Sequence, residues 1–145
     1  MERASTFFYE RQSEEARRRE EELRQDMPTT VLVRKVADWR GMKLEDEQAE
    51  RLGLWLHYGF GATGGPVATV LARTTPIGPL SAGLAVGTAM FVFVDEGANY
   101  VLGLTPPAPE WPLVTHVRAL AAHLVYGLAH GSFLAVAGRV ADRQG

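Results

Sequence analysis

Two adjacent carboxylates, Asp95 and Glu96, directly follow an apolar segment, residues 74–94, that contains no Asp, Glu, Lys or Arg. Further along the chain, histidine recurs every seven residues, at His116, His123 and His130. Histidine titrates near neutral pH, so these residues are candidates for proton handling as well as for simple packing. Seven residues of helix rise about 10.5 Å, which is too far for two of these histidines to share a metal ion. The spacing therefore predicts no metal site.

A cation close to the carboxylates would lower the cost of burying them. Arg118 precedes the last apolar segment, and we expect it to pair with Asp95 or Glu96. Ser81 and Thr88 are spaced by seven with Asp95, which predicts a polar stripe facing the interior of a helix bundle. In the alternative, the carboxylates lie close enough to a loop to be hydrated. The predicted polar cluster comprises Asp95, Glu96, His57, Tyr58, His116, Arg118, His123 and Tyr126.

Nothing in the sequence predicts a catalytic residue or a cofactor. Residues 59–64 match G-x-G-x-x-G, but no strand pattern precedes them and no acidic residue follows at the spacing that a dinucleotide site needs. Cysteine is absent, and the chain shows neither a nucleophile–base pair nor a phosphate loop with a lysine. We therefore do not expect an enzyme.

Glycines predict close packing between helices. Each of three apolar segments contains one G-x-x-x-G pair, formed by Gly61 with Gly65, Gly83 with Gly87, and Gly127 with Gly131. Such pairs let two helix backbones come into near contact in a membrane. They indicate a compact bundle or a homo-oligomer.

The elements that must position these residues are long apolar helices. Three segments lack Asp, Glu, Lys and Arg altogether: residues 52–72, 74–94 and 119–138. About 20 apolar residues are needed for a helix to cross the hydrocarbon core. We predict an all-α membrane domain over residues 52–145, a small bundle of three transmembrane helices at about residues 52–72, 79–102 and 115–138. A soluble helical subunit of a larger complex is the alternative.

The first 51 residues form a charged head, with 11 of the 15 Lys and Arg and 13 of the 17 Asp and Glu. Residues 10–24 predict a solvated helix with almost no face to bury. Pro28 and Gly41 predict the start and end of a second helix, and residues 45–47 suit the first turn of a third. The net charge of −2 excludes an overall field that would attract nucleic acid. The head is expected to be exposed to solvent or interfacial.

A set of residues in the second half also carries a family resemblance: His57-Tyr58-Gly59, Asp95-Glu96, Gly103, Pro112, His116, Arg118, Leu120, His123, Tyr126 and Gly127. In their order and spacing the chain resembles the YagU-like inner-membrane proteins, a bacterial family of unknown function, and the match extends back to residues 9–11. The resemblance implies a multi-pass protein of the bacterial inner (plasma) membrane, with the lipid bilayer as a partner. The family typically has another apolar span before residue 9, so either that span is lost here or the start of the chain is placed too late.

Two functions fit these features. In the first, the protein is proton-responsive or handles a solute through the Asp/Glu/His/Arg cluster. In the second, it is a non-catalytic structural or accessory membrane subunit, and the cluster only holds helices together. Arg73, Arg139 and Arg143 favour a cytoplasmic position for the loop after the first span and for the C-terminus, which places the charged head outside.

Overall fold

The computed structural model describes residues 13–23 and 26–142, and every regular element in these ranges is helical. The all-α prediction is therefore confirmed. In chain order the elements are α2 (Glu14–Leu23), α3 (Pro28–Trp39), α4 (Asp46–Ala62), α5 (Gly64–Thr74), α6 (Pro79–Ala89), the π-helix η1 (Met90–Ala98), α7 (Asn99–Val101), the 3₁₀ turn η2 (Ala108–Glu110) and α8 (Leu113–Asp142).

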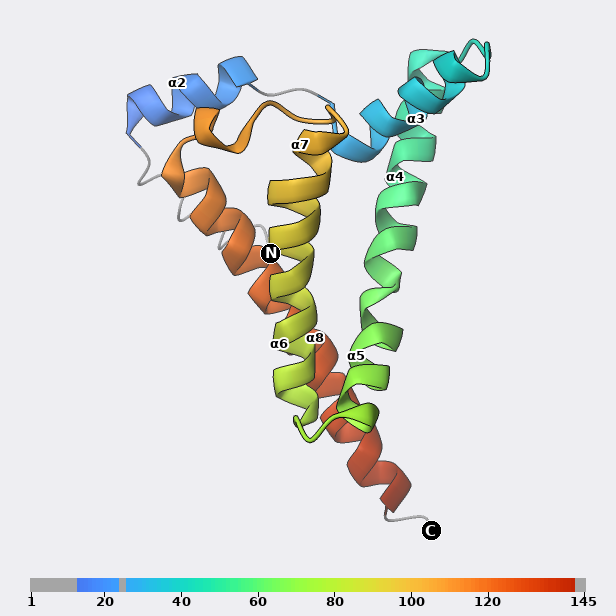
Figure 1. The fold of residues 1–145 in the computed structure, drawn as a ribbon, viewed down its shortest axis with the longest axis vertical. Helices are drawn as coiled ribbons and strands as arrows, with labels where there is room; N and C mark the ends of the chain where they lie inside the picture. Colours follow the sequence, from blue (N-terminus) through green and yellow to red (C-terminus); the bar gives the residue numbers. More distant parts are fainter. Residues whose placement is uncertain (1–12, 24–25, 143–145) are drawn as a thin grey trace.

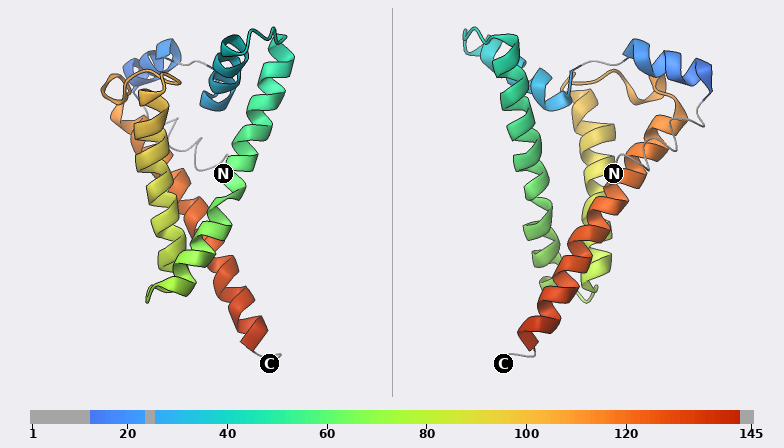
Figure 2. Two further views of the ribbon diagram at one scale, coloured as in Figure 1. Left: turned by 45° about the vertical axis from the view of Figure 1, so that its right-hand side comes forward. Right: turned by 180° about the vertical axis from the view of Figure 1, so that it is seen from behind.

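Two long arms diverge from one end of the molecule (Figure 1). The first consists of α4 and α5, and the second of α6, η1 and α7, which follow one another as a single rod. The helix α8 crosses behind this rod and projects beyond it at the C-terminal end (Figure 2). The helices α2 and α3 lie at the opposite end, together with the proline-rich loop between α7 and α8. The charged head therefore caps the end where the arms are furthest apart.

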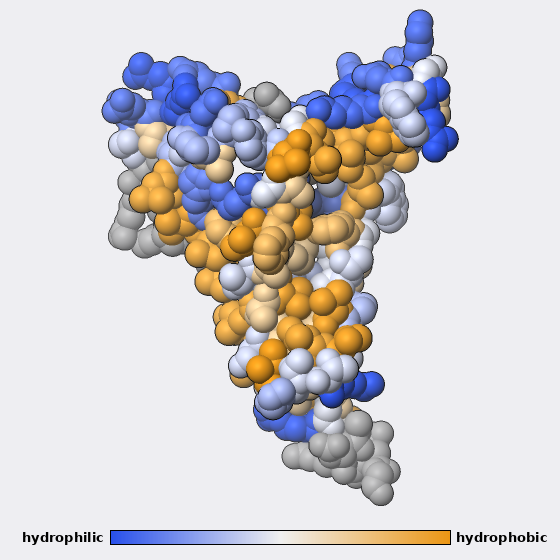
Figure 3. Space-filling view, in the orientation of Figure 1, coloured by the Kyte–Doolittle hydropathy of each residue, from blue (hydrophilic) through white to orange (hydrophobic). Residues whose placement is uncertain are grey.

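Within residues 13–23 and 26–142, two helical segments are long and apolar enough to cross a membrane, Pro79–Val101 and Leu113–Val140. Only 22% and 11% of their most apolar windows are buried, whereas the core helix of a soluble protein would be mostly buried. On the face shown in Figure 3, hydrophobic residues extend in a band across the middle of the molecule, over both arms, between polar ends. Exposed apolar surface of this extent is typical of a membrane or protein interaction face, so it adds to the indication of membrane association that the helix lengths give.

The predicted first span, residues 52–72, is not among these two segments, because the helix is interrupted. Pro66 has no N–H to donate to the carbonyl of Ala62, the partner that an unbroken helix would give it. Thr63 instead donates its N–H to the Phe60 carbonyl at 3.0 Å, and α4 gives way to α5 at this point. The described residues thus contain two helices of membrane length and one interrupted arm, and the predicted bundle of three transmembrane helices is not confirmed.

The rod and α8 cross at glycines, as the G-x-x-x-G pairs predicted. A Cβ atom added to Gly83 would overlap the Gly127 carbonyl oxygen and come within 2.8 Å of the Gly131 nitrogen. A Cβ atom on Gly87 would overlap the His123 carbonyl oxygen. The two backbones are therefore in direct contact, which only residues without a side chain allow.

The glycine pair on the first segment behaves differently. A Cβ atom on Gly61 would meet nothing within 4 Å, so this glycine is not packed closely against another helix of the same chain. Gly65 does face α8, since its Cβ would lie 2.9 Å from Cδ2 of His130. The neighbouring Gly64 makes the tighter contact, against the hydroxyl of Tyr126. The G-x-x-x-G spacing therefore did not indicate that Gly64 and Gly65, rather than Gly61, face α8.

The second helix of the head starts and ends as predicted, and the third starts as predicted. Pro28 occupies the first turn of α3, and Gly41 has a φ of 67°, which a residue with a side chain rarely adopts. Glu45 and Gln48 form a capping box at the start of α4. The guanidinium of Arg34 hydrogen-bonds Asp46 at 2.7 Å, which raises the pKa of Arg34 and links α3 to α4.

The charged helix α2 is not fully solvated, contrary to prediction. Glu20 is only 4% exposed, and its carboxylate accepts hydrogen bonds from Arg118 and from the Thr115 hydroxyl, both on α8. Arg19 reaches Glu110 in the proline-rich loop. Glu20 and Arg19 thus attach α2 to α8 and to the proline-rich loop.

Candidate functional site

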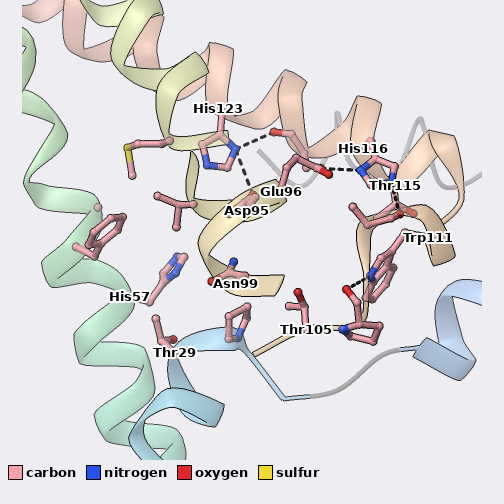
Figure 4. Close-up of a pocket in the computed structure, with 18 residues that line it drawn as sticks. Thr29, His57, Asp95, Glu96, Asn99, Thr105, Trp111, Thr115, His116 and His123 are labelled. Carbon is pink, nitrogen blue, oxygen red and sulfur yellow. Dashed lines mark hydrogen bonds and ion pairs between the residues drawn. The ribbon is translucent and has the colours of Figure 1, made fainter. Parts of the chain in front are cut away.

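A cavity of about 390 Å³ lies where the two arms diverge (Figure 4). Its walls come from α4, η1 and the start of α8, and α3 and the proline-rich loop contribute its outer edge. We call it the polar cavity. Five of the residues predicted for the polar cluster line it: His57, Asp95, Glu96, His116 and His123.

The carboxylates reach this cavity because the rod changes helix type. Asp95 and Glu96 lie in η1, a π-helix of 9 residues with i→i+5 hydrogen bonds, a form that is rare and often found at functional sites. The predicted stripe is wrong, since Ser81 and Thr88 are exposed while α6 buries its glycine face. The wider turn changes the direction in which side chains point, so a spacing of seven does not keep Asp95 in line with Thr88.

The Glu96–His116 pair is held together by a proton. Nδ1 of His116 lies 2.6 Å from Oε1 of Glu96, and Nε2 lies 3.0 Å from the carbonyl oxygen of Ala108. A carbonyl oxygen can only accept, so Nε2 must be the donor to Ala108. One further proton must lie between Nδ1 and Oε1, carried either by the imidazolium or by the carboxyl group. In both cases the pair has no net charge.

Asp95 has a looser partner. Nδ1 of His123 lies 3.7 Å from Oδ2 of Asp95 and only 2.9 Å from the Ala119 carbonyl oxygen, to which it donates. His57 approaches the same cavity from α4, on the opposite wall (Figure 4). Asp95 therefore faces two histidines without a direct hydrogen bond to either.

Arg118 does not neutralise these carboxylates, so the predicted pairing is wrong. Its guanidinium hydrogen-bonds Glu20 on α2, where the two side chains are 20% and 5% exposed. Sequence reasoning overlooked Glu20 because it is one of several glutamates in a charged helix. No local pattern distinguishes it, and its partner lies 98 residues away.

Two tyrosines of the predicted cluster lie outside the polar cavity. Tyr58 is 64% exposed and makes an edge contact with the His57 ring. Tyr126 donates its hydroxyl proton to the carbonyl of Gly61 at the break between α4 and α5, and its ring lies 4.3 Å from that of His130. His130 lines a separate open depression with Gly65 and Phe133. These residues connect the broken arm to α8 rather than joining the carboxylates.

Across the described residues, no three His, Asp or Glu side chains are grouped so as to hold a metal ion. The segment 59–64 lies within α4 and the break that follows it, in helical surroundings. No family model, curated protein or solved structure matches the chain. The resemblance to the YagU-like proteins therefore stays a prediction.

Proposed function

We propose that this chain is an integral membrane protein whose polar cavity takes up and releases protons, together with a small solute. The observation that carries the proposal is the pair of carboxylate–histidine contacts, Glu96 with His116 and Asp95 with His123, in one cavity between apolar helices. A carboxylate within a membrane helix costs about 3 kcal/mol to insert, so it is usually retained for a function.

The exposed apolar band supports insertion in a bilayer. Charged residues lie at its two ends: Arg73 and Arg139 at one, and the charged head at the other. We further propose that α4 and α5 together form a third crossing, since Thr63 keeps helical dihedrals (φ −71°, ψ −23°) across the break. The distribution of arginine favours a cytoplasmic position for Arg73 and Arg139. The resemblance to YagU-like proteins favours the bacterial inner membrane.

The membrane assignment is tested by alkaline extraction of cell membranes that contain the full chain. An integral protein stays in the pellet because its exposed apolar surface is covered by lipid. Recovery in the soluble fraction would refute the proposal and favour a helical subunit of a soluble complex.

The role of the cavity is tested with Asp95→Asn in protein reconstituted into liposomes that contain a pH-sensitive dye. We expect the variant to insert normally but to lose the proton movement that the wild-type protein shows under a pH gradient. Glu47→Gln is the matched control, because Glu47 lies on the exposed start of α4 and pairs only with Arg51 among the described residues. If Asp95→Asn lowers stability and leaves proton movement unchanged, the cavity is structural, as in an accessory subunit.

A further inference from the structure

The walls of the polar cavity are mostly apolar, although its chemistry is carried by a few polar groups. Phe60, Met90, Val94 and Trp111 line it, together with prolines of α3 and the loop. Its volume of about 390 Å³ falls within the range of sites for small organic molecules. The cavity therefore suits a ligand with an apolar body and one polar group.

The charge of that polar group follows from the charges already present. The Glu96–His116 pair is neutral overall, and no Lys or Arg is among the described residues that line the cavity. Asp95 is the other acidic group of the lining, and its nearest basic group is the imidazole of His123, whose Nδ1 lies 3.7 Å from Oδ2 and donates to the Ala119 carbonyl instead. Within the described part of the chain no donor lies within hydrogen-bond distance of its oxygens. A positively charged hydrogen-bond donor placed in the cavity could therefore pair with the oxygens of Asp95.

Further acceptors surround the same space. The Thr29 hydroxyl oxygen is buried and has no hydrogen-bond partner among the described residues, although Thr29 lines the cavity. Asn99 lies one turn beyond Asp95 on the rod and also lines it (Figure 4). Trp111 is held by a hydrogen bond from its indole nitrogen to the Pro106 carbonyl at 3.3 Å. A fixed indole ring attracts cations.

From these contacts we infer that the polar cavity binds a monovalent organic ammonium group, with its nitrogen against Asp95 and Asn99 and its apolar part against Phe60, Met90 and Trp111. This inference rests on the proposed function, because it names the class of solute that the cavity would take. An ammonium from a free amine and one from a lipid headgroup share this chemistry. Anions are disfavoured since the lining holds carboxylates and no Lys or Arg.

The test measures binding of labelled benzylamine to the full chain in nanodiscs of phosphatidylglycerol, with empty discs subtracted. Benzyl alcohol and benzoate are the neutral and anionic probes of the same shape. We expect saturable binding of benzylamine only. Loss of one charge-assisted hydrogen bond in Asp95→Asn should weaken it by about tenfold or more, whereas Glu47→Gln should leave it unchanged. Met90→Trp, which narrows the cavity without changing charge, should also weaken it.

Several outcomes would overturn the inference: no saturable binding of benzylamine, equal binding of benzyl alcohol, or tighter binding of benzoate. Adding phosphatidylethanolamine to the discs distinguishes the source of the ammonium. If this lipid competes with benzylamine, the natural ligand is a lipid headgroup; if it does not compete, the ligand is a free amine. The proposed function fails separately. If benzylamine does not bind but Asp95→Asn still abolishes proton movement in liposomes, only the ligand class is wrong. Soluble recovery after alkaline extraction would instead refute the membrane assignment.

Discussion

The two ends of the pair formed by the α6–α7 rod and α8 are built in opposite ways. At one end, Gly83 and Gly87 bring the rod into backbone contact with α8. At the other end the same two helices diverge (Figure 2). There Glu96 contacts His116 and Asp95 approaches His123, and both helices line the polar cavity together with α4. The absence of side chains on the glycines allows the close contact at the first end, and the charged and polar side chains line the open space at the second. A tightly packed crossing can therefore support an open polar site on the same two helices.

The largest expected effect comes from filling the crossing. Gly83→Ala would place a methyl group on the Gly127 carbonyl, so we expect the free energy of unfolding to fall by about 3 kcal/mol. The measurement is SDS titration of the protein in mixed micelles. Gly59→Ala is the matched control, because its Cβ meets nothing within 4 Å. In an exposed helix this change should stabilise by about 0.5–1 kcal/mol. Equal effects of the two substitutions would show that the crossing is not tightly packed.

A smaller effect is expected where α2 is attached at the open end. Arg118→Ala removes the guanidinium that hydrogen-bonds the buried carboxylate of Glu20, and we expect the docking of α2 to weaken by about 2 kcal/mol. Hydrogen exchange of the α2 amides should accelerate accordingly, while that of α6 should not change. Arg73→Ala, at an exposed site on the other end, is the control.

Adding Glu20→Ala to Arg118→Ala should recover part of the loss, because the double variant no longer buries a carboxylate that has lost its hydrogen bond to the guanidinium. If the double variant is as unstable as the sum of the single variants, the two residues do not act as a pair.

The smallest effect is expected where the broken arm meets α8, between the two ends. Tyr126→Phe removes the hydrogen bond to the Gly61 carbonyl and should cost about 1 kcal/mol. The ring and its contact with the His130 ring would remain, so only the interactions of the hydroxyl, with Gly61 and Gly64, are lost. Exchange of the amides in 59–66 reports it. Tyr58→Phe, at an exposed position with no such bond, should change nothing.

Local rules accounted for the helices and several of their ends. Pro28, Gly41 and the acidic residues 45–47 act within a few residues of themselves, so their effect on the backbone is visible in the sequence. The glycine pairs of the last two apolar segments also predicted a contact correctly, because small residues are what such an approach requires. The interruption near Pro66 follows from the missing N–H in the same way.

The errors arose where direction or distance in space decided the outcome. The partner of Arg118 depends on how α2 lies across the molecule, and nothing near Glu20 in the chain indicates it. The direction in which the Asp95 side chain points depends on the π-helix η1, which the residue types in 90–98 do not predict. His123 and His130 lie on one stripe of α8 by their spacing. In the structure, however, His123 lines the polar cavity and His130 lines the separate depression beside Gly65.

The sequence by itself determined an all-helical chain with exposed apolar segments, charged ends, glycine contacts and a set of carboxylates and histidines, because these depend on residue type and local spacing. Only the tertiary structure decided which carboxylate meets which histidine, that Arg118 belongs to Glu20, and that a cavity opens beside Asp95. Those outcomes depend on the angle between helices and on the π-turn of η1, since a small change in either moves a side chain to another partner.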